Sequence, residues 1–168
     1  EPLRVLRVRV GADNPLGLTA DVTFTARGPV IEEPRFTYRH ENRPVLDLTR
    51  LTQFGAWSGT IDVDGTRIAI APERVLGCRD RSWGIRPVGE PEGGSPSGIA
   101  QYFWLWAPVH FDDVCVHFDV NEDAQGRRWH QNGLLVPVGT ADPAGIEVMT
   151  AVGHRLRWTS GMRRAAGA

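Results

Sequence analysis

Residues 18–27 of the chain read LTADVTFTAR, and this stretch decides the class of fold. Its apolar side chains stand at every second position, from Leu18 to Ala26, and polar side chains fill the positions between them. Successive side chains of a β-strand point to opposite faces of the sheet. This period of two therefore predicts a strand with one buried face and one solvated face.

The same alternation recurs along most of the chain. Residues 3–10 (LRVLRVRV) predict a second strand with its arginines outside. Residues 60–71 (TIDVDGTRIAIA) predict a hairpin, because Asp64 and Gly65 tolerate the positive φ of a tight primed turn. Further strands, which should form a meander, are predicted after polar turns within residues 114–120, 127–138 and 146–158.

Helix signals are weak in comparison. The chain contains 19 glycines and 12 prolines, and residues 46–54 (LDLTRLTQF) are the stretch that could hold a turn or two of helix. Residues 87–98 (PVGEPEGGSPSG) have the composition of a flexible connecting loop, with a lid as the alternative. The strands together predict an all-β, antiparallel fold, either a sandwich or a barrel.

The composition argues against several classes of function. The chain carries 19 basic against 20 acidic residues, so it lacks the basic field that dominates the binding of nucleic acid. Every cation is an arginine, and the absence of lysine excludes a lysine Schiff base or a phosphate-loop lysine within this chain. No apolar run is long enough to cross a bilayer as a helix, so we expect no transmembrane segment.

Metal-binding and disulfide motifs are also missing from the sequence. The five histidines lack the close spacing of a zinc site, and Cys78 and Cys115 form neither a CxxC pair nor a disulfide framework. Asp119, Asn121 and Asp123 alternate as in a calcium loop, but the required glycine and glutamate are missing, so we interpret them as part of an acidic hairpin turn. We expect no metal, no cofactor and a cytoplasmic location.

Residues 99–107 (IAQYFWLWA) predict a strand that is apolar on both faces. Tyr102, Trp104 and Trp106 share one face, while Phe103 and Leu105 share the other. One face should pack in a core, and the aromatic face should line an interior that can hold an apolar ligand. The alternative is that these aromatic side chains fill a solid core.

Residues 77–87 (GCRDRSWGIRP) place unusual charge in a strand-like region. In an extended chain Arg79, Arg81 and Trp83 point one way, while Asp80, Ser82 and Arg86 point the other way. We expect Asp80 to be ionised and held by one or more of the three arginines. If this ion pair is a buried lock, Asp80→Asn should cost about 3–5 kcal/mol of stability. The alternative is a carboxylate poised at the base of an apolar pocket.

These segments resemble a known family. The stretches GTIDVDG, GCRDRSWGIRP, YFWLWAPVHFDD and RRWHQNGLLVPV, between Gly55 and Val138, resemble the AttH-like proteins related to the carotenoid 1,2-hydratases. The resemblance implies a lipocalin-like (calycin) barrel or half-barrel within a two-barrel protein that acts on isoprenoid or similarly apolar molecules. Arg81 stands where the family usually has histidine, and an arginine cannot accept and return a proton, so the resemblance does not carry hydratase chemistry with it.

The resemblance also divides the chain. Residues 1–52 would supply strands that complete a preceding barrel half, and residues 53–168 would form the lipocalin-like domain. The remainder of a longer chain would then be one partner. His117 and His130, on neighbouring predicted strands, could face one another inside the barrel.

The sequence leaves three functional hypotheses. The first is binding of an apolar small molecule, isoprenoid or lipid-like, in an aromatic-lined barrel. The second is a hydratase or isomerase in which Asp80 is the catalytic acid, and the third is a structural half-barrel that packs against the rest of a longer protein. The candidate ligand-binding residues are Arg79, Arg81, Trp83, Tyr102, Trp104, Trp106, His117 and His130.

Overall fold

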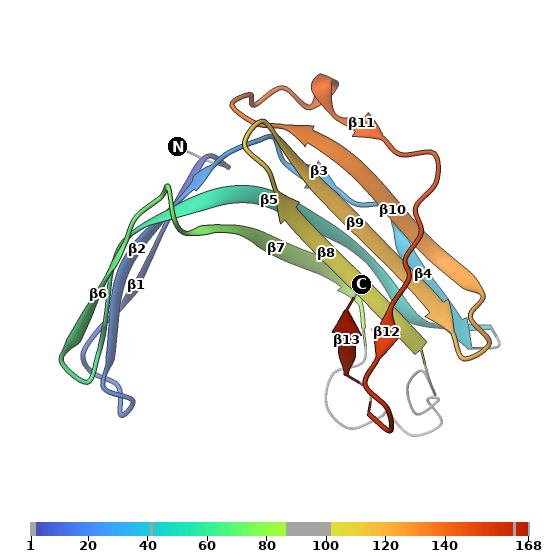
Figure 1. Ribbon diagram of the computed structural model, residues 1–168, viewed down its shortest axis with the longest axis horizontal. Coiled ribbons are helices and arrows are strands. Elements are labelled where there is room, and N and C mark those ends of the chain that lie inside the picture. The colour runs from blue at the N-terminus through green and yellow to red at the C-terminus, as the bar shows by residue number, and fades with distance from the viewer. Residues whose placement is uncertain (1–2, 41, 87–101, 163, 168) are drawn as a thin grey trace.

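The computed structural model describes residues 3–40, 42–86, 102–162 and 164–167 and shows two main antiparallel sheets (Figure 1). The first sheet contains β1 (Val5–Val10), β2 (Leu18–Ala26), β3 (Ile31–Glu32), β4 (Phe36–His40), β5 (Arg43–Val63), β6 (Thr66–Ile70) and β7 (Leu76–Ile85). The second sheet has the order β11 (Glu147–Val148), β10 (Arg128–Pro137), β9 (Val114–Asp123), β8 (Tyr102–His110). A small ribbon pairs β12 (Arg157–Trp158) with β13 (Ala165–Gly167), and a 3-10 turn, η1, spans Pro143–Gly145.

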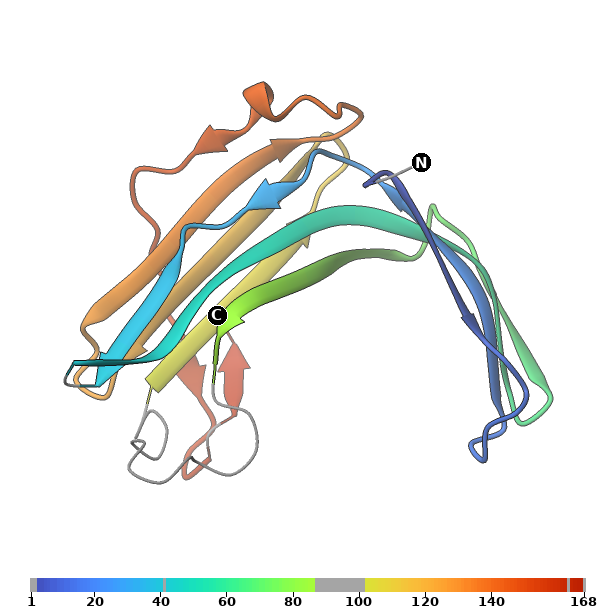
Figure 2. The same ribbon diagram turned by 180° about the vertical axis from the view of Figure 1, so that it is seen from behind.

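The all-β, antiparallel class predicted from the sequence is confirmed. Every strand pair in the two main sheets is antiparallel. The meander predicted for residues 114–158 forms as β9, β10 and β11, but of residues 146–158 only Glu147–Val148 pairs with β10, and Arg157–Trp158 joins the separate ribbon with β13. The described strands form an open, curved sheet covered at one end by the second sheet, and they do not close into a barrel (Figures 1 and 2). The half-barrel form of the prediction therefore fits the structure.

Strand β5 organises the first sheet. Its first part pairs with β4 and β3 on one side and with β7 on the other, and its last part pairs with β2 and β6. Residues 46–54, the one stretch considered for a helix, lie inside β5, so that expectation is wrong. The boundary expected between residues 52 and 53 also falls inside β5, which pairs with strands from both sides of it.

The hairpin predicted around Asp64 and Gly65 joins β5 to β6. Val63 pairs with Thr66, and the two turn residues adopt φ angles of 49° and 80°. Both residues of a type I′ turn need positive φ, which aspartate and especially glycine tolerate. The turn chemistry that identified this hairpin in the sequence therefore also sets its register.

The second sheet packs on the first part of β5, and together they form a β-sandwich. Its apolar core contains Ile31, Phe54, Cys115, Leu134 and Val136. The outer face of the second sheet is covered by the C-terminal segment, residues 146–158. In this cover, Met149 N–H donates to the Gly133 carbonyl, and the ring of Phe103 contacts the rings of His154 and Trp158.

The remaining part of the first sheet extends away from the sandwich as a wing, formed by β1, β2, β6 and residues 55–63 of β5 (Figure 1). One face of the wing is polar and carries the bidentate pair between Arg7 and Asp21. The other face is apolar. Phe24 is buried there, while Leu6 and Ile68 stay more than 40% exposed.

Some expectations fall outside the described residues. The loop predicted at 87–98 and the side chain of Tyr102 lie there, so the structure says nothing of either. Among the residues that are described, no helix has the length and apolar character needed to cross a membrane.

Gly55 of β5 packs closely against Phe24 of β2, and this contact generates a prediction. A Cβ atom at this position would lie 2.2 Å from the ring of Phe24, whereas one at Gly153 would have no heavy atom within 4 Å. We expect Gly55→Ala to lower the free energy of unfolding by about 1–3 kcal/mol through overpacking. Urea denaturation measures this change, with Gly153→Ala as the control. Equal stability of the two variants would contradict the packing described for Phe24.

Candidate functional site

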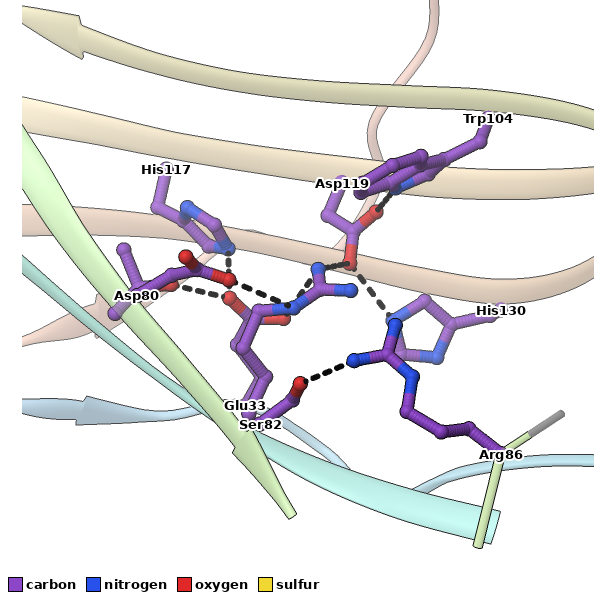
Figure 3. A network of polar contacts seen from close by, with 10 residues as sticks. Glu33, Asp80, Ser82, Arg86, Trp104, His117, Asp119 and His130 are labelled. Atoms are coloured by element: carbon purple, nitrogen blue, oxygen red, sulfur yellow. Dashed lines mark hydrogen bonds and ion pairs between the residues drawn. The ribbon is translucent and has the colours of Figure 1, made fainter. Parts of the chain in front are cut away.

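A cluster of charged side chains lies between the two sheets of the sandwich (Figure 3). We call Glu33, Arg50, Asp80, His117, Asp119 and His130 the polar cluster. The strands supply these side chains by alternation: Arg50 and Asp80 stand on the faces of β5 and β7 that point towards the second sheet, and His117 and Asp119 stand at alternate positions of β9. The cluster continues the apolar core along the same strands.

Arg50 is the centre of this cluster. Its guanidinium lies 3.3 Å from Glu33 Oε2, 3.7 Å from Asp80 Oδ2 and 3.9 Å from Asp119 Oδ2. The same guanidinium stacks on the Trp104 ring, with its central carbon 5.2 Å from the ring centroid. One cation therefore contacts carboxylates from both sheets.

Two histidines pair with the buried carboxylates. His117 Nε2 lies 3.2 Å from Glu33 Oε1, and His130 Nε2 lies 3.0 Å from Asp119 Oδ2. Each carboxylate is also oriented by a neutral donor. The Thr52 hydroxyl donates to Glu33 Oε1 at 2.6 Å, and the indole N–H of Trp104 donates to Asp119 Oδ1 at 3.0 Å.

The surroundings of Glu33 act on its acidity in opposite directions. Burial alone would raise the pKa of this carboxyl, because desolvation disfavours the charged form. The contacts with His117, Thr52 and Arg50 outweigh burial and lower the pKa of Glu33 below its ordinary value. Glu33 is therefore held as a carboxylate in the interior of the sandwich.

Four of the residues predicted from the sequence meet in this region. Asp80, His117, His130 and Trp104 lie in or against the polar cluster (Figure 3). Trp106 is nearby, with its ring centroid 6.1 Å from that of His117.

The other predicted residues of β7 lie elsewhere. Arg79, Arg81 and Trp83 occupy alternate positions on the face of the first sheet that points away from the second sheet. Arg79 donates to Gln53 Oε1 and lies over the ring of Phe24, which stands on the apolar face of the wing.

The partner expected for Asp80 is wrong. Among the described residues Asp80 pairs with Arg50 of β5 and not with the neighbouring arginines, since Arg79 donates to Gln53 and Arg86 donates to Ser82. The side chain of Asp80 is 53% exposed, so this contact is not a buried lock. The expected cost of Asp80→Asn therefore falls to that of a surface ion pair, roughly 0–1 kcal/mol.

Sequence reasoning missed Glu33, Arg50 and Asp119. The sequence predicts Asp119 in an acidic hairpin turn, and this is wrong, because Asp119 is fully buried in β9. Asp123 is the residue that accepts hydrogen bonds from the turn, from the backbone N–H groups of Gln125 and Arg127. A signal was present. Polar residues alternate in two consecutive strands, as His117, Asp119 and Asn121 and then as His130 and Asn132.

An antiparallel β-sandwich with an ionic cluster in its interior is thus the class of protein defined by the fold and site. Over residues 1–168 the chain matches a family described as "Family of unknown function (DUF8625)", and it belongs to that family. No curated protein and no solved structure is significantly similar to it.

The central position of Arg50 leads to a prediction. Arg50→Gln would leave Glu33 and Asp119 buried without a guanidinium, and breaking a buried ion pair in this way should cost about 3–5 kcal/mol. Arg81→Gln removes an exposed arginine on the other face of the sheet and should change stability by less than about 0.5 kcal/mol. Chemical denaturation at neutral pH compares the two. A loss below about 1 kcal/mol for Arg50→Gln would show that the carboxylates are compensated in another way.

Proposed function

We propose that the chain binds a small, largely apolar molecule with a polar end in the interior between the two sheets. One observation carries this proposal. Several buried polar atoms on the inner side of the second sheet have no hydrogen-bond partner among the described residues. They are Trp106 Nε1, both ring nitrogens of His117, both amide atoms of Asn121, Trp129 Nε1 and Asn132 Nδ2.

So many unpaired polar atoms close together are unusual in the interior of a folded protein. Buried polar groups are nearly always hydrogen-bonded, and each one left without a partner costs about 1–3 kcal/mol. These atoms come from three neighbouring strands, β8, β9 and β10, and their side chains include both donors and an acceptor. A bound molecule with a hydroxyl or carbonyl group would satisfy several of them at once.

Aromatic rings surround these polar atoms. Phe36 and Tyr38 of β4 contact Trp129 with ring centroids 4.8 and 5.2 Å apart, and Phe36 also contacts His130. Trp104 and Trp106 add two indole rings from β8. Small-molecule sites combine apolar and aromatic lining with a few placed polar groups, and this interior has both.

Trp104 lies at the border between the interior and solvent. This side chain is 47% exposed although its indole N–H reaches the buried Asp119, so one edge of the ring faces solvent and the other faces the cluster. Asp80 is also half-exposed. An apolar ligand would enter against the Trp104 ring and bring its polar end towards β9.

The sequence resemblance to the AttH-like proteins supports an isoprenoid or lipid-like ligand. Binding is preferred over the hydratase hypothesis, because a carboxyl group that acts as an acid catalyst is normally kept protonated by apolar surroundings. Asp80 is half-exposed and lies beside the Arg50 guanidinium, which is a different environment.

Two tryptophans of similar exposure allow a matched test. Trp104 and Trp83 are 47% and 46% exposed, but Trp83 lies on the opposite face of the first sheet. With retinol as the probe, an isoprenoid with one hydroxyl group, we expect Trp104→Ala to weaken binding about tenfold or more, since lost aromatic contact is worth over a kcal/mol. Trp83→Ala should leave the affinity unchanged. Fluorescence titration measures both, and equal affinities for the two variants would contradict this location of the site.

The amide of Asn121 gives a second test. Because both of its amide atoms are buried without a partner, Asn121→Leu should raise the free energy of unfolding by about 1–3 kcal/mol while it weakens retinol binding. Gain of stability with loss of function is typical of a binding residue. Gln125→Leu, on the exposed β9–β10 turn, is the control for adding an apolar side chain. A destabilised Asn121→Leu protein would mean that the amide is already satisfied in the free chain.

A further inference from the structure

Ligand atoms of Glu33, His117 and Asp119 converge inside the polar cluster. One such atom from each residue lies within 4.8 Å of the other two, and all three side chains are buried. His130 adds a fourth nitrogen, 3.0 Å from Asp119 Oδ2. Donor atoms around a tetrahedral Zn²⁺ are about 3.3–3.5 Å apart, given metal–ligand distances of about 2.0–2.2 Å. The three atoms are up to 4.8 Å apart and His130 contacts Asp119 alone among them, so a metal ion would have to draw these side chains closer together.

The state of His117 points independently to a missing ligand. This side chain is completely buried, and neither of its ring nitrogens has a hydrogen-bond partner among the described residues. Its Nε2 atom approaches Glu33 Oε1 to 3.2 Å, but without the alignment of a hydrogen bond. Figure 3 shows the ring directed at the Glu33 carboxylate. The tautomer that lacks a proton on Nε2 offers its lone pair to a cation beside the Glu33 carboxylate.

Charge balance supports a cation at the same place. Glu33, Asp80 and Asp119 bring three negative charges, and Arg50 is the one guanidinium that the structure pairs with them. Arg50 alone leaves an excess of two negative charges, and the remaining partners of these carboxylates are the imidazoles of His117 and His130. A divalent cation would remove that excess, which is otherwise costly to bury.

The carboxylates are already oriented as metal ligands usually are. Thr52 donates to Glu33, and the Trp104 indole donates to Asp119, so each carboxylate is fixed by a neutral outer donor. Hydrogen-bond donors of this kind commonly orient the side chains that bind a metal ion. Arg50 contacts Glu33 through Oε2, whereas His117 faces Oε1, so Glu33 can hold Arg50 and a metal ion with different oxygens.

The structure assigns Glu33, His117, Asp119 and His130 to a binding site for a first-row divalent metal ion, with Zn²⁺ as the preferred ion. Mixed imidazole and carboxylate donors favour Zn²⁺ over Ca²⁺ and Mg²⁺, which prefer oxygen ligands alone. The sequence predicted no metal because Glu33 lies far from the histidines along the chain, and only the packing of the two sheets brings them together. This site shares His117 with the proposed ligand site, but it does not require a bound apolar molecule.

Zinc binding to the purified full chain tests this assignment. We expect isothermal titration with ZnSO₄ to show one ion per chain with a micromolar or lower Kd, and dialysis followed by elemental analysis to retain one equivalent. His117→Ala should weaken binding at least 100-fold. The matched control is His154→Ala, which removes a histidine that also contacts a carboxylate, Glu122, but on the outer side of the second sheet.

Co²⁺ titration of the unaltered protein keeps the assignment testable if His117→Ala fails to fold. A four-coordinate site with two imidazoles should give the intense visible absorption of tetrahedral Co²⁺, and excess Zn²⁺ should abolish it. No stoichiometric zinc binding by the unaltered chain would overturn the assignment, as would equal affinity of His117→Ala or a loss of binding in His154→Ala alone. Retinol affinity, measured separately, shows whether the ligand proposal survives either result.

Discussion

The guanidinium of Arg50 is the interaction on which the rest of the sandwich depends. It reaches carboxylates that follow β3, belong to β7 and belong to β9, so a single side chain connects elements of both sheets. Burying these charges is favourable only while the whole arrangement is in place, because each group alone would carry a large desolvation penalty. The relative placement of the two sheets and the chemistry of their interior are therefore fixed by the same contacts.

Much of the fold follows from local patterns. The alternation from Leu18 to Ala26 and the Asp64–Gly65 turn each specify a strand or a hairpin through the backbone geometry of a few consecutive residues. Residues 46–54 gave the wrong prediction because their leucines also fit a helical spacing. What decides their state is pairing with β4 and β7, and that pairing lies outside the segment itself.

The site was less predictable, for a physical reason. In β9 the apolar residues Val116, Phe118 and Val120 would be expected to face the core, yet His117 and Asp119 point into the sandwich. The C-terminal segment partly covers the other face of the sheet, where Val120 is buried and Val116 and Phe118 are half-buried. Alternation alone therefore does not show which face of β9 points into the sandwich. The charge pairing of Asp80 with Arg50 is likewise a product of β5–β7 register, which no single stretch of sequence encodes.

The wing has a consequence for how the protein behaves in solution. Its apolar face leaves Leu6, Val8 and Ile68 in contact with water, and β1 and β6 lie at its two edges. Exposed strand edges readily join other chains unless charge keeps them apart. Arg7 and Arg9 on β1 share the single carboxylate of Asp21, so one net positive charge remains there, and repulsion between such charges is weakened by salt. Sulfate also strengthens apolar association, so the chain should be most soluble at low ionic strength and should self-associate through the wing in ammonium sulfate.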